Sequence, residues 1–352
     1  MPKRYLGNII TDTPTAPTDN YETTSASGVW SLAEAFAYTK AGLWPTAGNA
    51  APQYAVVGGG SDSYVNTMSR LNIVSTGSAA DFGDLTVGVN NNAACSSATR
   101  GVFAGGFDGT DVKNDMSYIT IATSGNAIDF GDLANAGQYL GNNSGCSSST
   151  RGIYGGGLNN SFSRTNVIQY ITIATTGNAA DFGDLLFVIK ETTAFSSSTR
   201  GVFSGGDYNV LGGRQNTIQY ITIASTGNAT DFGDLTQAKA ACSGLADSTR
   251  GITAGGGLEN GNAVNVIEYI TIASTGNGTD FGDLVSVRSD AVGVAGSTSG
   301  LVIAGANSGG TADNFIDYFT IQTTGNSADW GDLNYSTKTF AGCSDSHGGL
   351  AA

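Results

Sequence analysis

Residues 219–235 read Gln219-Tyr-Ile-Thr-Ile-Ala-Ser-Thr-Gly-Asn-Ala-Thr-Asp-Phe-Gly-Asp-Leu235, and close copies of this stretch recur along the chain. The Asp-Phe-Gly-Asp-Leu core starts at Asp81, Asp129, Asp181, Asp231 and Asp280, and an Asp-Trp-Gly-Asp-Leu variant starts at Asp329. These six starts lie 48, 52, 50, 49 and 49 residues apart. A regular period near 50 residues is typical of propellers and solenoids, so the sequence predicts a repeat architecture.

Each unit reads as the same four segments. In the unit that ends at Leu235 these are residues 193–198, 199–206, 217–225 and 231–235. The third segment is β-branched or aromatic on both faces, which is typical of a strand that is covered on both sides. Paired glycines end the second segment, and in five units a Gly-Asn pair after the third supplies a tight turn. Four strands in each of six units predict an all-β fold, a six-bladed β-propeller.

The two ends of the repeat region predict how the ring closes. The first unit starts at a second strand, Tyr54–Gly59, and the segment Thr339–Ser346 after the last motif is a first strand without a partner. Pairing these two segments would complete one blade from both ends of the region and would remove an open sheet edge.

The motif order within a unit is Arg-Gly-aliphatic-aromatic-x-Gly-Gly, a loop, an aliphatic-x-Tyr strand and aromatic-x-x-Leu, and it resembles the kelch repeat over about residues 52–346. The resemblance implies that one Tyr and one further aromatic residue of each unit pack between blades. The matching tyrosines are Tyr118, Tyr170, Tyr220, Tyr269 and Tyr318, and the further aromatic residues are Phe82, Phe130, Phe182, Phe232, Phe281 and Trp330. Such a resemblance concerns architecture and says little about chemistry.

Residues 1–50 differ in composition from the propeller region, residues 51–352. Ser31 and Glu34 form a capping box, and Gly42 and Pro45 are stop signals, which together predict a short helix over residues 32–41. A helix of this length is unstable in isolation, so it must dock on the propeller or on another protein. We expect residues 1–50 to be an attachment segment that contacts a neighbouring protein through Trp30, Leu32, Phe36 and Trp44.

Charge and composition exclude several partners. The net charge of −14 argues against nucleic acid and against anionic membrane surfaces. No apolar run approaches the ~20 residues that span a bilayer, so we expect no membrane insertion. The first residues show no signal-peptide pattern, which predicts synthesis in a cytoplasm.

The four cysteines, Cys95, Cys146, Cys242 and Cys343, lie on corresponding segments of different units. They form no Cys-x-x-Cys pair, so a zinc site has no support. Corresponding strands of separate blades are usually too far apart for a disulfide. We therefore expect four buried free thiols and no metal or cofactor.

The Asp-aromatic-Gly-Asp motifs place twelve carboxylates in repeated positions, and two interpretations are open. Clustered carboxylates suit calcium. The interpretation that we favour is structural: one Asp accepts backbone N–H bonds, and the other meets a nearby Arg, for which Arg100, Arg151, Arg200 and Arg250 recur once per unit.

The sequence offers little for catalysis. His347 is the single histidine, and no Gly-x-Ser-x-Gly elbow is present, so neither a histidine-rich metal centre nor a serine triad is supported. A glycosidase based on two convergent carboxylates stays open as an alternative. We expect a protein that is not an enzyme.

The loops of an antiparallel propeller fall on two faces. The turn face carries the turns between strands 1 and 2 and between strands 3 and 4, and its sequence is monotonous. The variable face carries the remaining loops, which differ in every unit, and variable loops on a rigid scaffold are where recognition normally occurs. Unconstrained drift of these loops is the alternative. The candidate binding residues on this face are Phe107, Asp108, Asp111, Asn159, Phe162, Arg164, Tyr208, Arg214, Glu259 and Asn262.

The beginning of the chain resembles virion proteins of tailed phages, especially marine ones. The matching residues are the Arg4-Tyr-Leu-Gly7 start and the Ser27-Gly-Val-Trp-Ser-Leu block that ends at Ala41-Gly-Leu-Trp-Pro45, ahead of Gly-rich β repeats. This resemblance implies a tail or fibre protein, located in the virion, that binds other virion proteins through residues 1–50 and forms homo-oligomers in the particle. The variable face would then bind a host-surface glycan or a virion partner. The alternatives are a capsid decoration or tail-assembly component, a carbohydrate-active enzyme and a cellular kelch-type scaffold.

Overall fold

The computed structural model describes residues 4–6, 9–11, 52–60, 64–134, 140–141, 144–208 and 213–350. The chain divides into two units, Met1–Pro52 and Gln53–Ala352. In the first unit, β1 (Arg4–Leu6) and β2 (Ile9–Thr11) pair as an antiparallel hairpin. The predicted helix over 32–41 and the side chains of Trp30, Leu32, Phe36 and Trp44 lie outside the described residues.

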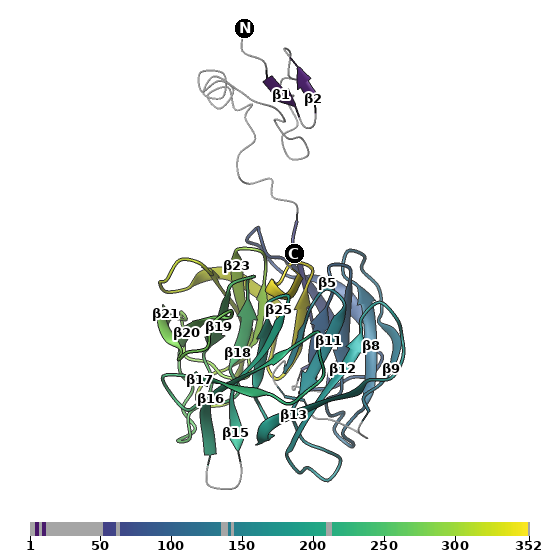
Figure 1. The fold of residues 1–352 in the computed structure, drawn as a ribbon, viewed down its shortest axis with the longest axis vertical. Coiled ribbons are helices and arrows are strands. Elements are labelled where there is room, and N and C mark those ends of the chain that lie inside the picture. Colours follow the sequence, from purple (N-terminus) through teal and green to yellow (C-terminus); the bar gives the residue numbers. More distant parts are fainter. Residues whose placement is uncertain are drawn as a thin grey trace. The chain divides into compact units, whose positions relative to one another are not determined.

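The second unit is the predicted six-bladed β-propeller (Figure 1). Each blade is a four-stranded antiparallel sheet whose strands follow one another from the central axis outward. Among the described residues of this unit, the one helical element is the short 3-10 helix η2 (Gly348–Leu350). Blade 1 consists of β26 (Ala341–Ser344), β3 (Tyr54–Gly58), β4 (Thr67–Asn72) and β5 (Ala80–Asp84).

The other five blades follow in chain order. Blade 2 contains β6 (Ala93–Ser96), β7 (Arg100–Ala104), β8 (Asp115–Thr120) and β9 (Ile128–Asp132). Blade 3 contains β10 (Gly145–Ser147), β11 (Arg151–Gly155), β12 (Thr165–Thr172) and β13 (Ala180–Ile189). Blade 4 contains β14 (Thr193–Ser196), β15 (Arg200–Tyr208), β16 (Gly213–Thr222) and β17 (Thr230–Asp234). Blade 5 contains β18 (Ser243–Ala246), β19 (Arg250–Ala254), β20 (Val266–Thr271) and β21 (Thr279–Asp283), and blade 6 contains β22 (Val292–Ala295), β23 (Ser299–Ala306), β24 (Ala312–Thr320) and β25 (Ala328–Thr337).

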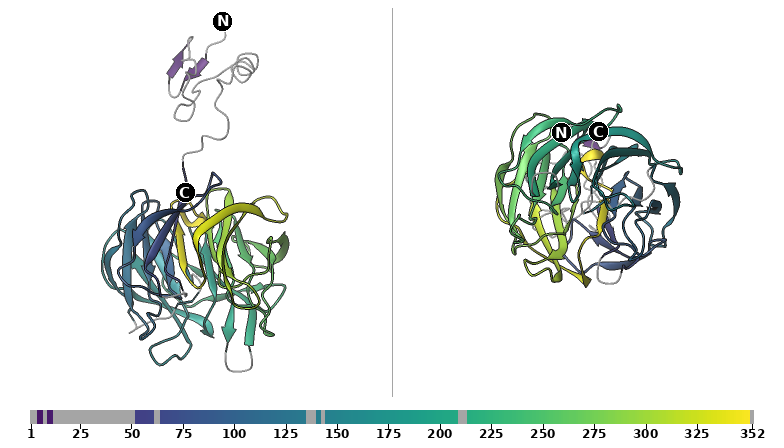
Figure 2. Two further views of the ribbon diagram at one scale, coloured as in Figure 1. Left: turned by 180° about the vertical axis from the view of Figure 1, so that it is seen from behind. Right: turned by 90° about the horizontal axis from the view of Figure 1, so that it is seen from below.

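The ring closes as the sequence predicts. β26 pairs antiparallel with β3, with Ala341 opposite Gly58 and Ser344 opposite Ala55, so the last strand of the chain lies beside the first strand of the propeller (Figure 2). The N–H of Tyr54 donates to the Asp345 carboxylate at 3.0 Å, and the N–H of Asp345 donates to the Tyr54 carbonyl at 3.0 Å.

These two hydrogen bonds match those of the turn between the first two strands of another blade, where the chain is continuous. In blade 2 the Arg100 N–H donates to the Ser97 hydroxyl at 3.1 Å, and the Ser97 N–H donates to the Arg100 carbonyl at 2.9 Å. Blade 1 therefore has the same structure as the other blades, except that no turn connects its first two strands. Hydrogen bonds between Tyr54 and Asp345 take the place of that turn.

The apolar core lies between neighbouring blades. Tyr118 and Phe130 of blade 2 pack edge to face, with ring centroids 6.1 Å apart, and they share a cluster with Tyr154 and Ile171 of blade 3. This is the packing that the aromatic residues of the repeat predict. Burial of one such aromatic side chain contributes about 1.5–3 kcal/mol.

The glycine of each Arg-Gly pair leaves room for a side chain of the preceding blade. A Cβ on Gly201 would lie 2.8 Å from the Cys146 sulfur, and one on Gly101 would lie 2.5 Å from the Cys343 sulfur. All four cysteines are buried and free, as predicted. Burial raises the pKa of the Cys95 thiol to about 12 and that of the Cys242 thiol to about 11, so these thiols stay protonated at neutral pH.

Candidate functional site

The turn face is taken up by a latch between neighbouring blades. Between blades 1 and 2, the Asn126 side-chain oxygen accepts the backbone N–H of Asp84 at 3.1 Å. The N–H groups of Gly125 and Ala127 donate to the carbonyls of Phe82 and Asp84 at 2.7 and 2.8 Å. The two motifs that recur most faithfully in the sequence therefore bind each other across the blade boundary.

The latch is repeated around most of the ring. The corresponding asparagines at the next four boundaries are Asn178, Asn228, Asn277 and Asn326. A Cβ on Gly83 would lie 2.5 Å from the Gly125 carbonyl oxygen, so glycine is needed for this close approach. Between blades 6 and 1 the turn has Ser78 in place of the asparagine, and the Ala79 N–H to Asp332 carbonyl distance is longer, at 3.4 Å.

The predicted pairing of the repeated arginines with the motif aspartates is wrong. The Arg100 guanidinium lies over the Tyr118 ring, 4.4 Å from its centroid, and donates to the Ile173 carbonyl of the next blade at 2.9 Å. Arg151, Arg200 and Arg250 make the same two contacts. The sheet register explains this difference: Val102 on β7 faces Tyr118 on β8, which brings Arg100 close to that ring, whereas the Asp-Phe-Gly-Asp motif lies one strand further out.

Blade 1 keeps the cation–aromatic contact with the two residue types exchanged. Tyr54 stands at the position of Arg100, and Arg70 stands at the position of Tyr118, with its guanidinium 4.7 Å from the Tyr54 ring centroid. The contact persists although both residues differ, which indicates that it stabilises the blade. The turn face is thus explained by architecture.

The variable face carries a row of three aromatic rings that spans blades 1 to 3. The ring centroids of Tyr64 and Phe107 are 5.7 Å apart, and those of Phe107 and Phe162 are 5.9 Å apart, both edge to face. We call these three residues the aromatic row. Phe107 is held by backbone bonds to Asn90 at 2.9 and 3.0 Å. Tyr64 was missed by sequence reasoning, because a single Tyr in a Ser-rich loop gives no signal until the loops are brought together.

Phe162 has a left-handed backbone conformation, with φ of 54°. The same turn occurs in blades 5 and 6, where Gly261 and Gly310 occupy the position of Phe162. In all three blades the residue at this position donates its N–H to the carbonyl three residues earlier. An aromatic residue in this conformation costs on the order of 1–2 kcal/mol relative to glycine.

The loops beside the aromatic row are held by their own side chains. The Asp108 carboxylate accepts the N–H groups of Thr110 and Asp111, both at 2.8 Å, and pairs with Lys113 at 2.6 Å. These contacts lower the pKa of Asp108 to about 2. Asn159 accepts two N–H groups of its loop in the same way. Asp108 and Asn159, predicted as binding residues, therefore shape their loops, while Asp111 is exposed.

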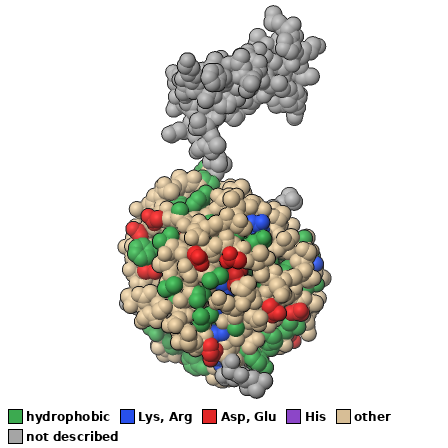
Figure 3. All heavy atoms as spheres, turned by 90° about the vertical axis from the view of Figure 1, so that its left-hand side faces the viewer, with side chains coloured by type: hydrophobic (Ala, Val, Ile, Leu, Met, Phe, Trp, Pro, Cys, Tyr) green, Lys and Arg blue, Asp and Glu red, His purple; other side chains and the backbone are tan. Residues whose placement is uncertain are grey.

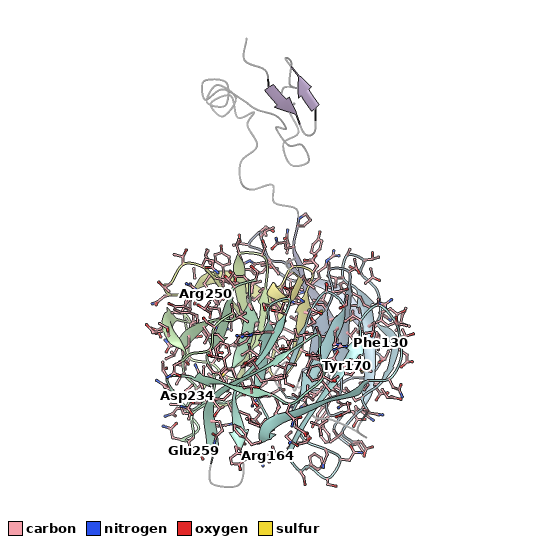
Figure 4. All side chains as sticks on the ribbon, viewed as in Figure 1. Phe130, Arg164, Tyr170, Asp234, Arg250 and Glu259 are labelled. Carbon is pink, nitrogen blue, oxygen red and sulfur yellow. The ribbon has the colours of Figure 1, made fainter. Side chains whose placement is uncertain are left out.

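A network of ion pairs covers the variable face over blades 3 to 5. Arg164 pairs with Asp207 at 2.9 Å, Arg214 pairs with Glu191 at 2.7 Å, and Lys190 pairs with both acids. Glu259 accepts the Arg214 backbone N–H at 2.8 Å. Arg164 and Glu259 lie at the same end of the propeller, and Arg250 lies at the other (Figure 4). The structure brings the predicted Arg164, Arg214 and Glu259 together with three residues that the sequence did not single out, Lys190, Glu191 and Asp207.

The two remaining predicted residues occupy different positions. Tyr208 packs on Phe187, with ring centroids 5.2 Å apart. Asn262 closes its turn through its main chain, because its carbonyl accepts the Leu258 N–H at 2.9 Å. The predicted set therefore separates into four groups: the aromatic row with its two loops, the ion-pair network, Tyr208 in its pair with Phe187, and Asn262 in a turn of blade 5.

The central channel is nearly filled. The innermost strands surround a cavity of about 50 Å³, and His347 lies at one mouth. The N–H of Gly349 donates to Nδ1 of His347 at 3.1 Å, which places the ring proton on Nε2, 3.2 Å from the Ser96 carbonyl. Burial lowers the pKa of His347 to about 4. A volume of this size is enough for one or a few water molecules.

The surface and the described side chains give two further findings. Acidic side chains are scattered over the side shown in Figure 3, with few basic ones. Among the described residues, no group of His, Cys, Asp or Glu is arranged to hold a metal ion, and no helix has the length and apolar character that crossing a membrane requires.

No protein family matches the chain. No curated protein matches it either.

Proposed function

We propose that this chain is a virion structural protein of a tailed phage, of the tail or fibre type, built on kelch-like repeats. Its variable face binds a host-surface glycan or a virion partner, and residues 1–50 attach it to the particle. The observation that carries this proposal is the contrast between the two faces. Latches and cation–aromatic contacts account for the turn face, and none of them accounts for the aromatic row.

Rigidity supports recognition by the variable face. Asp108 and Asn159 fix their loops by local hydrogen bonds, and the ion-pair network joins described residues of blades 3, 4 and 5 to one another. Loops that are already ordered lose little conformational entropy on binding, which favours affinity.

The position of Gln53, where the propeller begins, supports the proposal that attachment and ligand binding belong to different parts of the chain. The Gln53 side chain accepts the Ser297 N–H at 2.9 Å and donates to the Ser297 hydroxyl at 2.8 Å, within a turn of the turn face. The first residue of the propeller unit, Gln53, is therefore held at the turn face, at the end of the propeller opposite the variable loops.

Blocking one face at a time tests the proposal. The native thiols are buried with raised pKa values, so a cysteine introduced on the surface can be labelled selectively with a maleimide-polyethylene glycol chain. Asn260→Cys places the label on the variable face, and Thr176→Cys is the matched control on the turn face, since both residues are exposed. We expect the label at Asn260 to reduce binding of the full-length protein to host cells and the label at Thr176 to leave it unchanged. Binding that is reduced only by the label at Thr176, or by neither label, would contradict the proposal.

A further inference from the structure

The aromatic row presents more exposed ring surface than a structural contact needs. The Tyr64 and Phe162 side chains are 37% and 56% exposed, although both contact Phe107. The row crosses three blades, and its rings succeed one another at spacings below 6 Å. The result is a narrow strip of three adjoining aromatic rings on the variable face.

The two outer rings of the row, Tyr64 and Phe162, stand on residues with a left-handed backbone conformation. Phe162 occupies a left-handed position that blades 5 and 6 fill with Gly261 and Gly310. Tyr64 also has positive φ, 51°. Strained positions persist where the surrounding structure holds them, and they gather at functional sites.

Neighbouring glycines make room for Tyr64. A Cβ on Gly109 would lie 2.8 Å from the Tyr64 ring. A Cβ on Gly88 would collide with the Tyr64 carbonyl. The loops of blades 1 and 2 are therefore shaped around this tyrosine, and the row is preformed.

From this geometry we infer that the aromatic row binds a neutral glycan chain, an inference that rests on the proposed function. Aromatic rings pack on the apolar C–H faces of sugars, and the flanking loops, 108–111 and 159–163, supply carboxylate, amide and hydroxyl groups for the sugar hydroxyls.

Charge selects a neutral glycan over an anionic one. The whole chain carries a net charge of −14. Beside the row, Lys113 is paired with Asp108, while Asp111 and Asp115 are exposed acids. Sulfated, sialylated or uronic acid polymers would meet like charge at this end of the face.

The test measures binding of the full-length protein to an array of neutral and anionic oligosaccharides, with affinity electrophoresis through gels that contain dextran, mannan or alginate. The key variant is Phe162→Gly, and the matched control is Phe315→Ser, an exposed aromatic residue of blade 6 that is 51% exposed. We expect the full-length protein to bind neutral glycans, and we expect Phe162→Gly to weaken this binding roughly tenfold or more, because it removes the most exposed aromatic ring of the row. The control variant should bind like the parent protein.

Folding is separated from binding by the melting temperature. Phe162→Gly should melt at the same temperature as the parent or higher, because glycine accepts the left-handed turn without strain. Binding to anionic glycans alone, binding to none of the neutral glycans, or neutral-glycan binding that Phe162→Gly leaves intact would each overturn the inference. If the label at Asn260 still blocks attachment to cells in that case, the proposed function stands and only the glycan assignment fails.

Discussion

At the residue scale, two corresponding positions at each blade boundary carry different residue types at different boundaries. The first position lies eight residues after the first Asp of each motif, and the second lies directly before the recurring Tyr of the next blade. At the boundary between blades 3 and 4 these two positions carry Ile189 and Gln219. At the next boundary the same positions carry Lys239 and Glu268, a fully buried ion pair at 2.7 Å. The chain therefore contains both an apolar–amide version and an ionic version of one contact.

We predict that Lys239→Ile alone lowers the free energy of unfolding by about 3–5 kcal/mol, because it leaves the buried Glu268 carboxylate without its counter-ion. The double variant Lys239→Ile, Glu268→Gln should recover most of this loss, because it recreates the Ile189 and Gln219 combination. Glu268 also accepts the Thr236 N–H, and Gln219 accepts the Leu186 N–H in the same way, so glutamine preserves that bond. Denaturant unfolding of Lys239→Ile, Glu268→Gln and the double variant measures the coupling energy between these two side chains. Equal stability of the single and double variants would contradict the prediction.

A second prediction concerns pH and His347. Its pKa is lowered from 6.5 to about 4 in the folded protein, so the folded state favours the neutral ring. The unfolded chain binds a proton at higher pH, and the stability that neutral His347 provides is therefore present above about pH 6.5 and is lost as the pH falls toward 4. Asp317 has the opposite sign, because its pKa is raised to about 6 by burial.

Comparison of the parent with His347→Gln isolates this effect, because Asp317 is common to both proteins. The difference in melting temperature between them should shrink as the pH falls from 7.5 to 4.5. A difference that is independent of pH would show that His347 does not titrate with unfolding.

At the scale of elements, the latch shows what the sequence could and could not predict. The recurring Gly-Asn pair correctly predicted a tight turn, and the period predicted the blades. That Asn126 bonds to the preceding blade could not be predicted, because the contact joins residues from two units whose relative placement depends on the closed ring. The arginine prediction failed for a similar reason: opposite charge suggested Asp, but strand order places Tyr118 nearer to Arg100.

The candidate site was also predicted only in part. The sequence located the variable loops, because they interrupt a regular pattern, and it identified Phe107 and Phe162 within them. It could not show that Tyr64 joins these rings, nor that Phe162 stands where two other blades have glycine.

The boundary between blades 6 and 1 offers a prediction at this scale. Ser78 is too short to accept the amide bond that Asn126 accepts in its place. Ser78→Asn should add a hydrogen bond and raise the free energy of unfolding by about 0.5–1.5 kcal/mol. Asn178→Ser, the reverse change at an intact latch, should lower it by a similar amount. Thermal unfolding checks both variants, and an unchanged or lower melting temperature for Ser78→Asn would contradict the latch account.

At the scale of the whole molecule, the propeller is a ring held shut without a covalent bond across the closing hairpin. β26 supplies the inner strand of blade 1, and Asp345 and Tyr54 exchange two hydrogen bonds where the other blades have a connecting turn. Gln53 ties blade 1 to Ser297 of blade 6. Both ends of the repeat region are therefore part of the closure, which a period of 50 residues and an unpaired first strand were enough to predict.

Truncation after Leu333 should destabilise the protein far more than any loop deletion, because it removes β26 and exposes the inner edge of β3. A chain that begins at Ala51 should unfold cooperatively near the melting temperature of the full-length protein, because it keeps every blade. Calorimetry of both chains distinguishes them. A stable ring without β26, or an insoluble chain from Ala51 onward, would contradict this assignment of structural roles.

An electron cryo-microscopy map of the intact virion tests the central claim most directly. The account predicts six-bladed density attached to the particle through residues 1–50, with the loops that carry Tyr64, Phe107 and Phe162 facing the solvent or contacting a second virion protein. A particle without this chain, or a propeller that is attached to the particle without any contact from residues 1–50, would contradict it.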